Sequence, residues 1–386
     1  MIQHVVRFIR PEIIILVTIL VTGCKSGHIQ TNVKPANTTV ADSAFSGYVP
    51  GKSLLAARDQ AVLKGLRWMN EFLDDEKNFR EIGLDTVYIF MELSATSANA
   101  NIRKEAKVAA NKFALRMQKH YLELNPAMLK HNKKKVELLD LLSEAKLLGL
   151  NPQPLKELAE TVFNKKFSKN GSISRERKKE VTAYDELETL LKKSSETEVF
   201  YILMDAYSME KADVAYPDNR FSLSLQLTDI LRYLKNRPFV SHNEDKSENK
   251  ELFYDHAFLA THIAYIFSNY GRLKLREQDA PWLYTYLRSN FHAVLAEEDV
   301  ELVGEFIDVF RSLGFSEEND AMVRSGTLML LRSQNPDGSW CNWQEFEFPY
   351  DAIHCAWCAV MGLRERTFLE NTPYHRRIRE ILNQIN

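Results

Sequence analysis

The sequence predicts an all-α fold built from stacked helical hairpins. Glycine and proline are scarce, with 14 and 12 among 386 residues, whereas folds made of many short strands need frequent turns. Apolar residues recur every three to four positions through most of the chain, which is the period of an amphipathic helix. The sequence contains no strand pair with a hairpin signal, no phosphate-binding loop and no glycine-rich dinucleotide motif.

Residues 1–23 are expected to form a signal peptide. Arg7 and Arg10 precede the unbroken apolar run from Ile13 to Val21, which is too short to span a bilayer as a mature helix. The segment ends in Val-Thr-Gly-Cys, which resembles the bacterial lipobox, where a signal peptidase cuts before a diacylated cysteine. The alternatives are an ordinary signal peptide with an incidental cysteine and an uncleaved anchor.

The lipobox resemblance implies a protein of the bacterial cell envelope that is attached to the membrane by lipid on Cys24. Stable anchoring takes at least two acyl chains. Lys25 follows the cysteine, which by analogy with enteric bacteria favours the outer membrane, with the body facing the periplasm. Residues 24–52 are rich in Ser, Thr, Asn, Gly and Pro and are expected to be a flexible tether, followed by a helical domain over residues 53–386.

Helical periodicity is the main signal from Leu54 onward, and Leu55, Val62, Leu66 and Met69 fall on one face of the first helix. Further helices are expected near residues 79–94, 101–122, 134–149, 153–166, 184–193, 196–211, 221–235, 251–270, 281–296, 299–313, 317–333, 350–366 and 373–385. The second half consists of helical hairpins of roughly forty residues, a length typical of stacked two-helix repeats. Such repeats form either an open superhelix or a closed toroid.

The formal net charge of −2 shows no excess of basic residues, so the composition predicts no nucleic-acid partner. The basic stretch from Lys165 to Lys179 is a local exception that could touch anionic lipid or cell-wall polymer. A solvated loop between helices is the simpler interpretation of this stretch.

One segment favours the closed toroid. Residues 324–340 (RSGTLMLLRSQNPDGSW) resemble the repeat motif of the terpenoid cyclases and protein prenyltransferases, the α/α toroid superfamily. In this motif Gly338 can adopt a positive φ, Gln334 can cap the following helix, and Trp340 can stack over the loop. The resemblance covers about residues 250–366 and implies a toroid.

The helix after this motif also resembles its counterpart in that superfamily. Residues 350–363 (YDAIHCAWCAVMGL) resemble the inner helix of prenyltransferase β subunits, which carries a zinc-binding histidine that His354 matches approximately. The aspartate-rich acid motif of the terpene cyclases and the Asp-x-Cys zinc pair of the prenyltransferases have no counterpart here. The resemblance therefore implies a fold and not a reaction.

Three cysteines remain beyond Cys24: Cys341, Cys355 and Cys358. An odd number of thiols in an oxidising compartment permits one disulfide with one free thiol, or a metal site. Cys341 could pair with either of the others, whereas a bridge between Cys355 and Cys358 is less plausible because one helical turn holds the side chains poorly for it. An unpaired cysteine could also simply pack as a small hydrophobe.

Three expected helices carry polar side chains at core-like positions. In chain order they hold Asp255 and His262, then Glu305, and then Asp351, His354 and Cys358. Within each helix the named residues share one face, because they are three, four or seven positions apart. The inner helices of a toroid would aim His262, Glu305 and His354 at one central cavity.

Two histidines and one carboxylate suit Zn²⁺ with an open position for water, or Fe²⁺. A zinc-bound water could attack a carbonyl or phosphoryl centre while Asp255 or Asp351 orients a histidine, and iron would permit oxidation chemistry. Cys358 is a further candidate ligand. The alternative is that His262 and His354 are satisfied core residues and that Glu305 borders a solvated edge.

Two functions follow from these observations. The first is a lipid-anchored, metal-dependent enzyme that acts on an unknown substrate in a central cavity. The second is a non-catalytic binding or scaffold lipoprotein that presents a helical groove to a protein or glycan partner. Convergence of His262, Glu305 and His354 in space would favour the first function, and their dispersal would exclude it.

Overall fold

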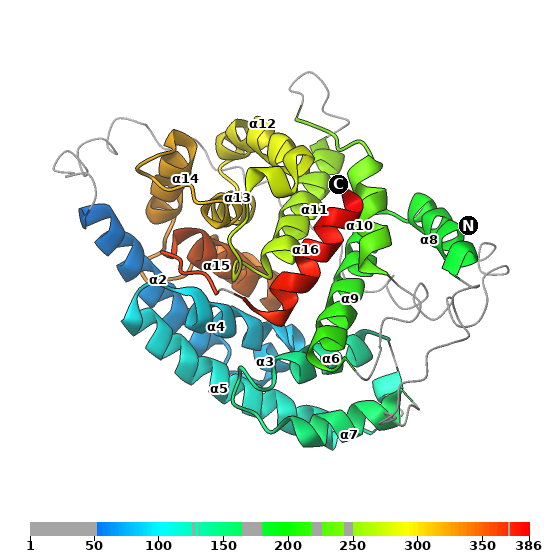
Figure 1. The fold of residues 1–386 in the computed structure, drawn as a ribbon. Coiled ribbons are helices and arrows are strands. Elements are labelled where there is room, and N and C mark those ends of the chain that lie inside the picture. Colours follow the sequence, from blue (N-terminus) through cyan, green and yellow to red (C-terminus); the bar gives the residue numbers. More distant parts are fainter. Residues whose placement is uncertain are drawn as a thin grey trace.

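The computed structural model describes residues 52–125, 128–130, 132–163, 180–217, 226–242, 250–369 and 371–386. Within these ranges the chain forms fifteen α-helices and no β-strand (Figure 1), which confirms the predicted all-α class. The expected signal peptide, the expected lipidated Cys24, residues 24–51 of the tether and the whole basic stretch at 165–179 lie outside the described residues.

The helices of the first half are α2 (Lys52–Phe72), α3 (Glu76–Ile82), α4 (Asp85–Thr96), α5 (Ala100–Glu123), α6 (Asn132–Glu144), α7 (Pro152–Val162) and α8 (Glu180–Lys193). The helices of the second half are α9 (Glu196–Ala215), α10 (Leu227–Asn236), α11 (Lys250–Ser268), α12 (Pro281–Glu297), α13 (Val300–Ser312), α14 (Ala321–Arg332), α15 (Pro349–Leu363) and α16 (Pro373–Ile385). Most of these bounds lie within a few residues of the expected ones.

Capping explains the largest differences from the expected bounds. The helix expected near 79–94 is two helices, because Gly83 adopts a φ of +67° and ends α3 there. The helix expected over 317–333 begins only at Ala321, since the Asp320 side chain accepts hydrogen bonds from the first backbone amides of α14. α15 ends at Leu363, where the next residue turns to extended backbone.

The helices pack as a continuous series of neighbours. α6 packs on α9, α9 on α11, α11 on α13, and α13 on α15. α15 also packs on α2 and α3, and α2 packs on α5, which in turn packs on α4, α6 and α7. α16 lies across α9 and α10 (Figure 1). An α/α toroid requires such a closed order of contacts, and the toroid itself stays a prediction.

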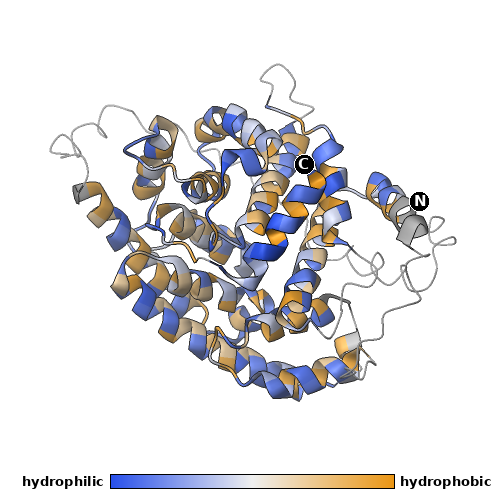
Figure 2. Cartoon of the chain, viewed as in Figure 1, coloured by the Kyte–Doolittle hydropathy of each residue, from blue (hydrophilic) through white to orange (hydrophobic). Residues whose placement is uncertain are grey.

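One hydrophobic core joins the two halves of the described chain, from Ala61 to Ile385. α11 and α15 bury most of their residues, whereas α16 buries a single face and shows a hydrophilic face toward the viewer in Figure 2. Among the described residues, no helix is both long enough and apolar enough to cross a bilayer.

The carboxyl-terminal ends of several helices meet in a buried network of ion pairs. Arg272, just after α11, donates to Glu92 near the end of α4 (2.7 Å) and to Glu144 at the end of α6 (3.1 Å). Lys211 of α9 lies 3.4 Å from Glu144. Asp308 of α13 pairs with arginine side chains that follow α15. Paired charges therefore occupy this end of the helices.

The loop between α14 and α15 fastens both helices to α2. Gly338 adopts a φ of +99°, as expected. Gln334 does not cap the next helix as expected: its side-chain amide donates to the backbone oxygens of Ala61 in α2 (2.9 Å) and of Gly338 (3.1 Å). Trp340 is fully buried against Gly65 of α2, where a Cβ would lie 2.6 Å from the indole ring.

Candidate metal centre

The close approach of α13 and α15 creates the candidate site. Gly304 lies against the backbone of α15, where a Cβ would come within 2.4 Å of the carbonyl oxygen of Cys358. Gly362 faces α13 in the same way, with a Cβ placed 2.8 Å from the carbonyl oxygen of Gly304. Only glycine permits this approach, and it brings Glu305 of α13 next to Cys358 and His354 of α15.

Three of the four expected ligands converge at this contact. The Cys358 Sγ lies 3.7 Å from His354 Nε2 and 3.8 Å from Glu305 Oε1. His354 Nε2 and Glu305 Oε1 are 4.0 Å apart. Zinc bonds of about 2.0–2.3 Å in a tetrahedral site separate the ligand atoms by about 3.3–3.6 Å. Small side-chain movements would therefore bring all three onto one ion.

Glu301 fixes the orientation of His354. Its Oε2 lies 3.1 Å from His354 Nδ1, which leaves Nε2 directed toward Glu305 and Cys358. A metal-bound histidine commonly donates its other ring N–H to a carboxylate in this manner. Burial alone would lower the pKa of His354, but its interactions with Cys358, Tyr350 and the Glu301 carboxylate raise it well above its usual value.

Burial favours the protonated forms of the Glu305 carboxyl group and the Cys358 thiol. It raises the pKa of Glu305 to about 8, against the opposing effects of His354 and of a hydrogen bond that Thr261 Oγ1 donates to Glu305 Oε2 at 2.5 Å. It also raises the pKa of the Cys358 thiol to about 12. Both groups are cheaper to bury neutral than ionised, and a divalent cation would offset the cost of ionising them.

His262 lies beside this group and not within it. Its Nδ1 donates to the backbone oxygen of Phe258 at 2.8 Å and lies 3.8 Å from Glu305 Oε2. Burial lowers the pKa of His262 to about 4, so the ring is neutral and only Nε2 is available as a ligand. Phe200 and Tyr265 pack edge-on against its ring, at centroid distances of 4.8 and 5.4 Å.

The two aspartates expected to assist the site have different surroundings. Asp351 is half-buried one turn before His354, and burial together with the charge of Glu301 raises its pKa. Asp255 is exposed on α11, seven residues from His262, and the structure does not bring it to the three converging ligands. The set of ligands is thus one carboxylate, one imidazole and one thiol, and not the expected two histidines with one carboxylate.

The cysteine alternatives resolve into one disulfide and one thiol. Cys341 pairs with Cys355, with Cα atoms 6.5 Å apart, and Cys358 is free and buried. The bridge ties the loop before α15 to the first half of that helix. The thiol that remains is the one that faces Glu305 and His354.

Sequence reasoning missed three residues of this site. Glu301 was not singled out, although it lies one helical turn before Glu305 and so shares its face. The sequence does not indicate that Thr261 contacts Glu305, because a threonine in an apolar helix usually hydrogen-bonds to the backbone of its own helix. Gly304 lies directly before Glu305, and a glycine inside a helix indicates a close packing contact.

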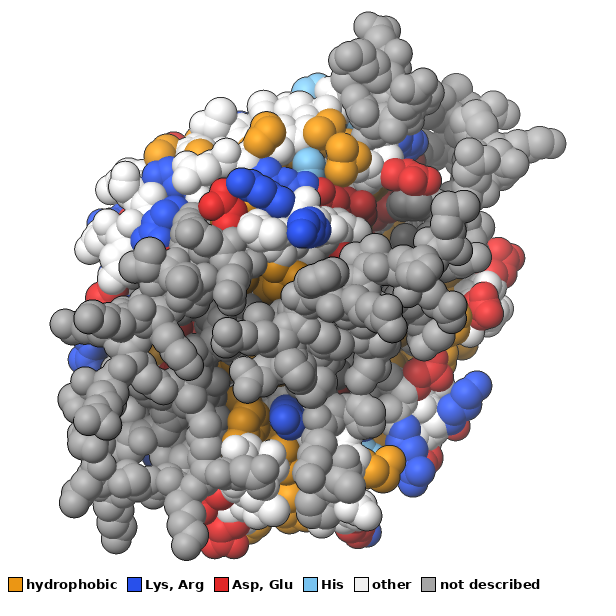
Figure 3. Space-filling model, turned by 90° about the vertical axis from the view of Figure 1, so that its right-hand side faces the viewer, with side chains coloured by type: hydrophobic (Ala, Val, Ile, Leu, Met, Phe, Trp, Pro, Cys, Tyr) orange, Lys and Arg blue, Asp and Glu red, His pale blue; other side chains and the backbone are white. Residues whose placement is uncertain are grey.

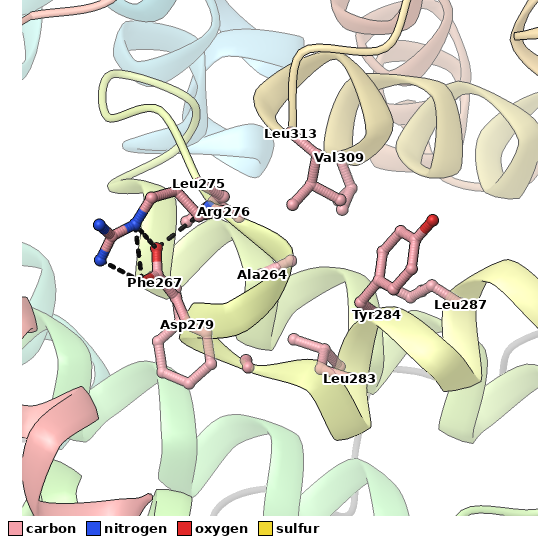
Figure 4. A pocket seen from close by; sticks show the side chains of 11 residues that line it. Ala264, Phe267, Leu275, Arg276, Asp279, Leu283, Tyr284, Leu287, Val309 and Leu313 are labelled. Atoms are coloured by element: carbon pink, nitrogen blue, oxygen red, sulfur yellow. Dashed lines mark hydrogen bonds and ion pairs between the residues drawn. The ribbon is translucent and has the colours of Figure 1, made fainter.

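A separate small pocket lies between α11, α12 and α13 (Figure 4). Leucine, valine and phenylalanine side chains line it, and its polar members Arg276 and Asp279 pair with each other (2.7 Å). None of the candidate site residues lines this pocket. On the face shown in Figure 3, the visible basic and acidic side chains of the described residues are interspersed.

No family model, curated protein or solved structure matches the chain significantly. The chemistry of the site must therefore be argued from its own geometry.

Proposed function

We propose that this chain is a lipid-anchored protein of the bacterial cell envelope whose α/α toroid holds a divalent metal ion at Glu305, His354 and Cys358 and acts as a metal-dependent enzyme. The observation that carries the proposal is the convergence of three ligand atoms, one from each residue, within 4.8 Å of one another. Three protein ligands leave one position of a tetrahedral ion for water or substrate.

Zinc is the ion that this set of ligands favours. A thiolate is a soft ligand that selects zinc over harder cations, while the imidazole and carboxylate are accepted by both zinc and iron. A bound zinc ion supplies an activated water near neutral pH, which suits hydrolysis of a carbonyl or phosphoryl centre.

The residues around the ion have separate tasks in this proposal. Glu301 holds His354 with Nε2 toward the ion, because it bonds Nδ1 at 3.1 Å. Asp351 is half-buried beside His354 and has a raised pKa, which suits a group that takes up and returns a proton during hydrolysis. Thr261 fixes one oxygen of Glu305 and leaves the other oxygen facing Cys358.

Metal analysis of the purified full chain tests the proposal. After loading with zinc in non-reducing buffer and removal of the excess, the wild type should retain about one equivalent of zinc. Cys358→Ser and His354→Ala should retain much less, because each removes one of three ligands. His292→Ala is the matched control, since this histidine is exposed on α12. A wild-type content near zero would refute the metal site.

A second candidate function rests on the same side chains without a metal. Cys358 Sγ lies 3.7 Å from His354 Nε2, and Glu301 holds Nδ1, which is the order of a thiol nucleophile, a base and an orienting carboxylate. The burial that raises the pKa of Cys358 to about 12 opposes this function. Rapid stoichiometric alkylation of Cys358 at neutral pH in metal-free protein would favour the nucleophile over the metal site.

The lipid anchor is supported by the lipobox-like residues 21–24 and the apolar run before them. Mass spectrometry of the membrane-extracted chain should find acyl groups on Cys24 as the first residue. Recovery of an unmodified chain that still begins before Cys24 would contradict the anchor. If Cys24 is acylated and the chain binds no metal, the alternative function is a binding or scaffold lipoprotein.

A further inference from the structure

The exposed apolar side chains of the described residues are concentrated along α5. Val108, Leu115 and Leu122 of this helix are 45–65% exposed. They are spaced by seven residues, so they form one line along the helix. Figure 1 shows α5 at the outer edge of the body, in keeping with the exposure of these three side chains.

Two further exposed apolar residues lie next to α5. Leu147, in the connection between α6 and α7, is held beside α5 because Lys107 Nζ donates to its backbone oxygen at 3.1 Å. Met128 follows just beyond the carboxyl-terminal end of α5 and is 53% exposed. Of the seven large hydrophobic side chains that are exposed in the described part of the chain, five therefore gather here. We call Val108, Leu115, Leu122, Met128 and Leu147 the α5 patch.

Two lysines flank the α5 patch. α5 contains six lysines and arginines against two glutamates. Lys112 and Arg116 pair with Asp74 and Glu76, whereas Lys119 has only an exposed pair with Glu123 at 3.8 Å. Lys104 lies one turn before Val108, and Lys119 lies one turn after Leu115 and just before Leu122, so both lysines are on the patch side of the helix. An apolar line flanked by lysines is typical of a helix that lies in the headgroup region of a membrane.

We propose that the α5 patch docks on an anionic phospholipid surface, with the apolar side chains in the headgroup boundary and the lysines on the lipid phosphates. The positive charge of the flanking lysines favours an anionic lipid surface over a second copy of the chain. Pairing two patches would bring the lysines of both copies together along an apolar seam, whereas an anionic surface neutralises them. The proposal does not depend on the metal site.

Vesicle binding of the full chain tests the proposal. The chain carries Cys24→Ser so that lipidation cannot hold it on the membrane. Vesicles of phosphatidylcholine alone are compared with vesicles of equal parts phosphatidylcholine and phosphatidylglycerol. The double variant Leu115→Gln/Leu122→Gln should bind the mixed vesicles at least about tenfold more weakly than its parent, since it loses two exposed leucines from the boundary.

Leu55→Gln is the matched control, because Leu55 is an exposed leucine (39%) on α2, outside the patch. The apolar leader is common to every variant, so only the differences between variants count. Lys104→Gln/Lys119→Gln should weaken binding to the mixed vesicles and leave the weak binding to phosphatidylcholine unchanged. Circular dichroism should show all variants folded, since the substituted side chains are exposed.

Equal binding by the patch variant and the Leu55→Gln control would overturn the proposal. So would a dimer in sedimentation velocity that the patch variant abolishes, together with binding that does not depend on phosphatidylglycerol. That second result would assign the α5 patch to contact between copies of the chain.

Discussion

Glu305 is a carboxyl group that is 2% exposed, and no arginine or lysine of the described residues pairs with it. Its neighbours are a threonine hydroxyl, a thiol and two imidazoles. Burial therefore favours its neutral form in the folded chain. Glu305 therefore contributes to the dependence of the free energy of unfolding on pH.

The sign of that dependence can be predicted. Folded Glu305 keeps its proton up to a pH of about 8, whereas the unfolded carboxyl gives it up near its ordinary value of 4.5. Unfolding between these values releases a proton, so the free energy of unfolding falls as the pH rises, by up to about 1.4 kcal/mol per pH unit. Denaturant unfolding of metal-free Glu305→Gln should show a shallower fall than the wild type over this range. Parallel pH profiles would contradict the raised pKa.

At the scale of elements, the contact of α13 with α15 determines whether the ligands meet. The pairing depends on Gly304 and Gly362, each of which lies on the backbone of the opposite helix. Backbone atoms in packed helices cannot move aside as the end of a side chain can. Small changes at this contact should therefore alter both stability and the site.

Gly304→Ala should destabilise the fold by about 2–4 kcal/mol, because its methyl group meets the Cys358 carbonyl at 2.4 Å. The same variant should retain less zinc, since α13 must move away from α15. Gly326→Ala is the matched comparison, because its methyl group meets the movable end of the Ile307 side chain at 2.7 Å. If chemical denaturation shows the same loss of unfolding free energy in both variants, the close backbone contact at Gly304 does not determine the stability of this helix pair.

At the scale of the whole molecule, the buried ion pairs connect segments that are far apart in the sequence. Arg272 bonds Glu92 and Glu144, so one side chain joins the first and second halves of the described chain. Removing one partner of such a network leaves uncompensated buried charge. The network thus makes the two halves depend on each other.

Arg272→Met should lower the free energy of unfolding by about 3–5 kcal/mol, because Glu92 and Glu144 lose their shared partner. Arg276→Met is the control: its side chain is 54% exposed, and its buried partner Asp279 keeps a second partner in Arg379. Denaturant unfolding should therefore show a change below about 1 kcal/mol for the control. Similar changes in both variants would contradict the role of the buried network.

The helices could be predicted from the sequence because periodicity and capping are local properties. The candidate site was predictable only in part, since Glu305 and His354 stand out as polar groups in apolar helices. Their meeting with Cys358 depends on the helix contact at Gly304, which no spacing along one helix encodes. The choice of Cys355 over Cys358 as the partner of Cys341 likewise depends on where the loop before α15 lies.

The packing of α2 on α15 has a consequence for how the chain is made. Arg58 Nε donates to the backbone oxygen of Leu363 across a separation of 305 residues. Synthesis proceeds from the amino terminus, so α2 can pack on α5 early but cannot meet α15 until nearly the whole chain has emerged. We therefore expect the face of α2 that packs on α15 to stay exposed for most of synthesis. For a protein proposed to be exported, late formation of the α2–α15 contact would keep the chain unfolded enough to pass through a translocon.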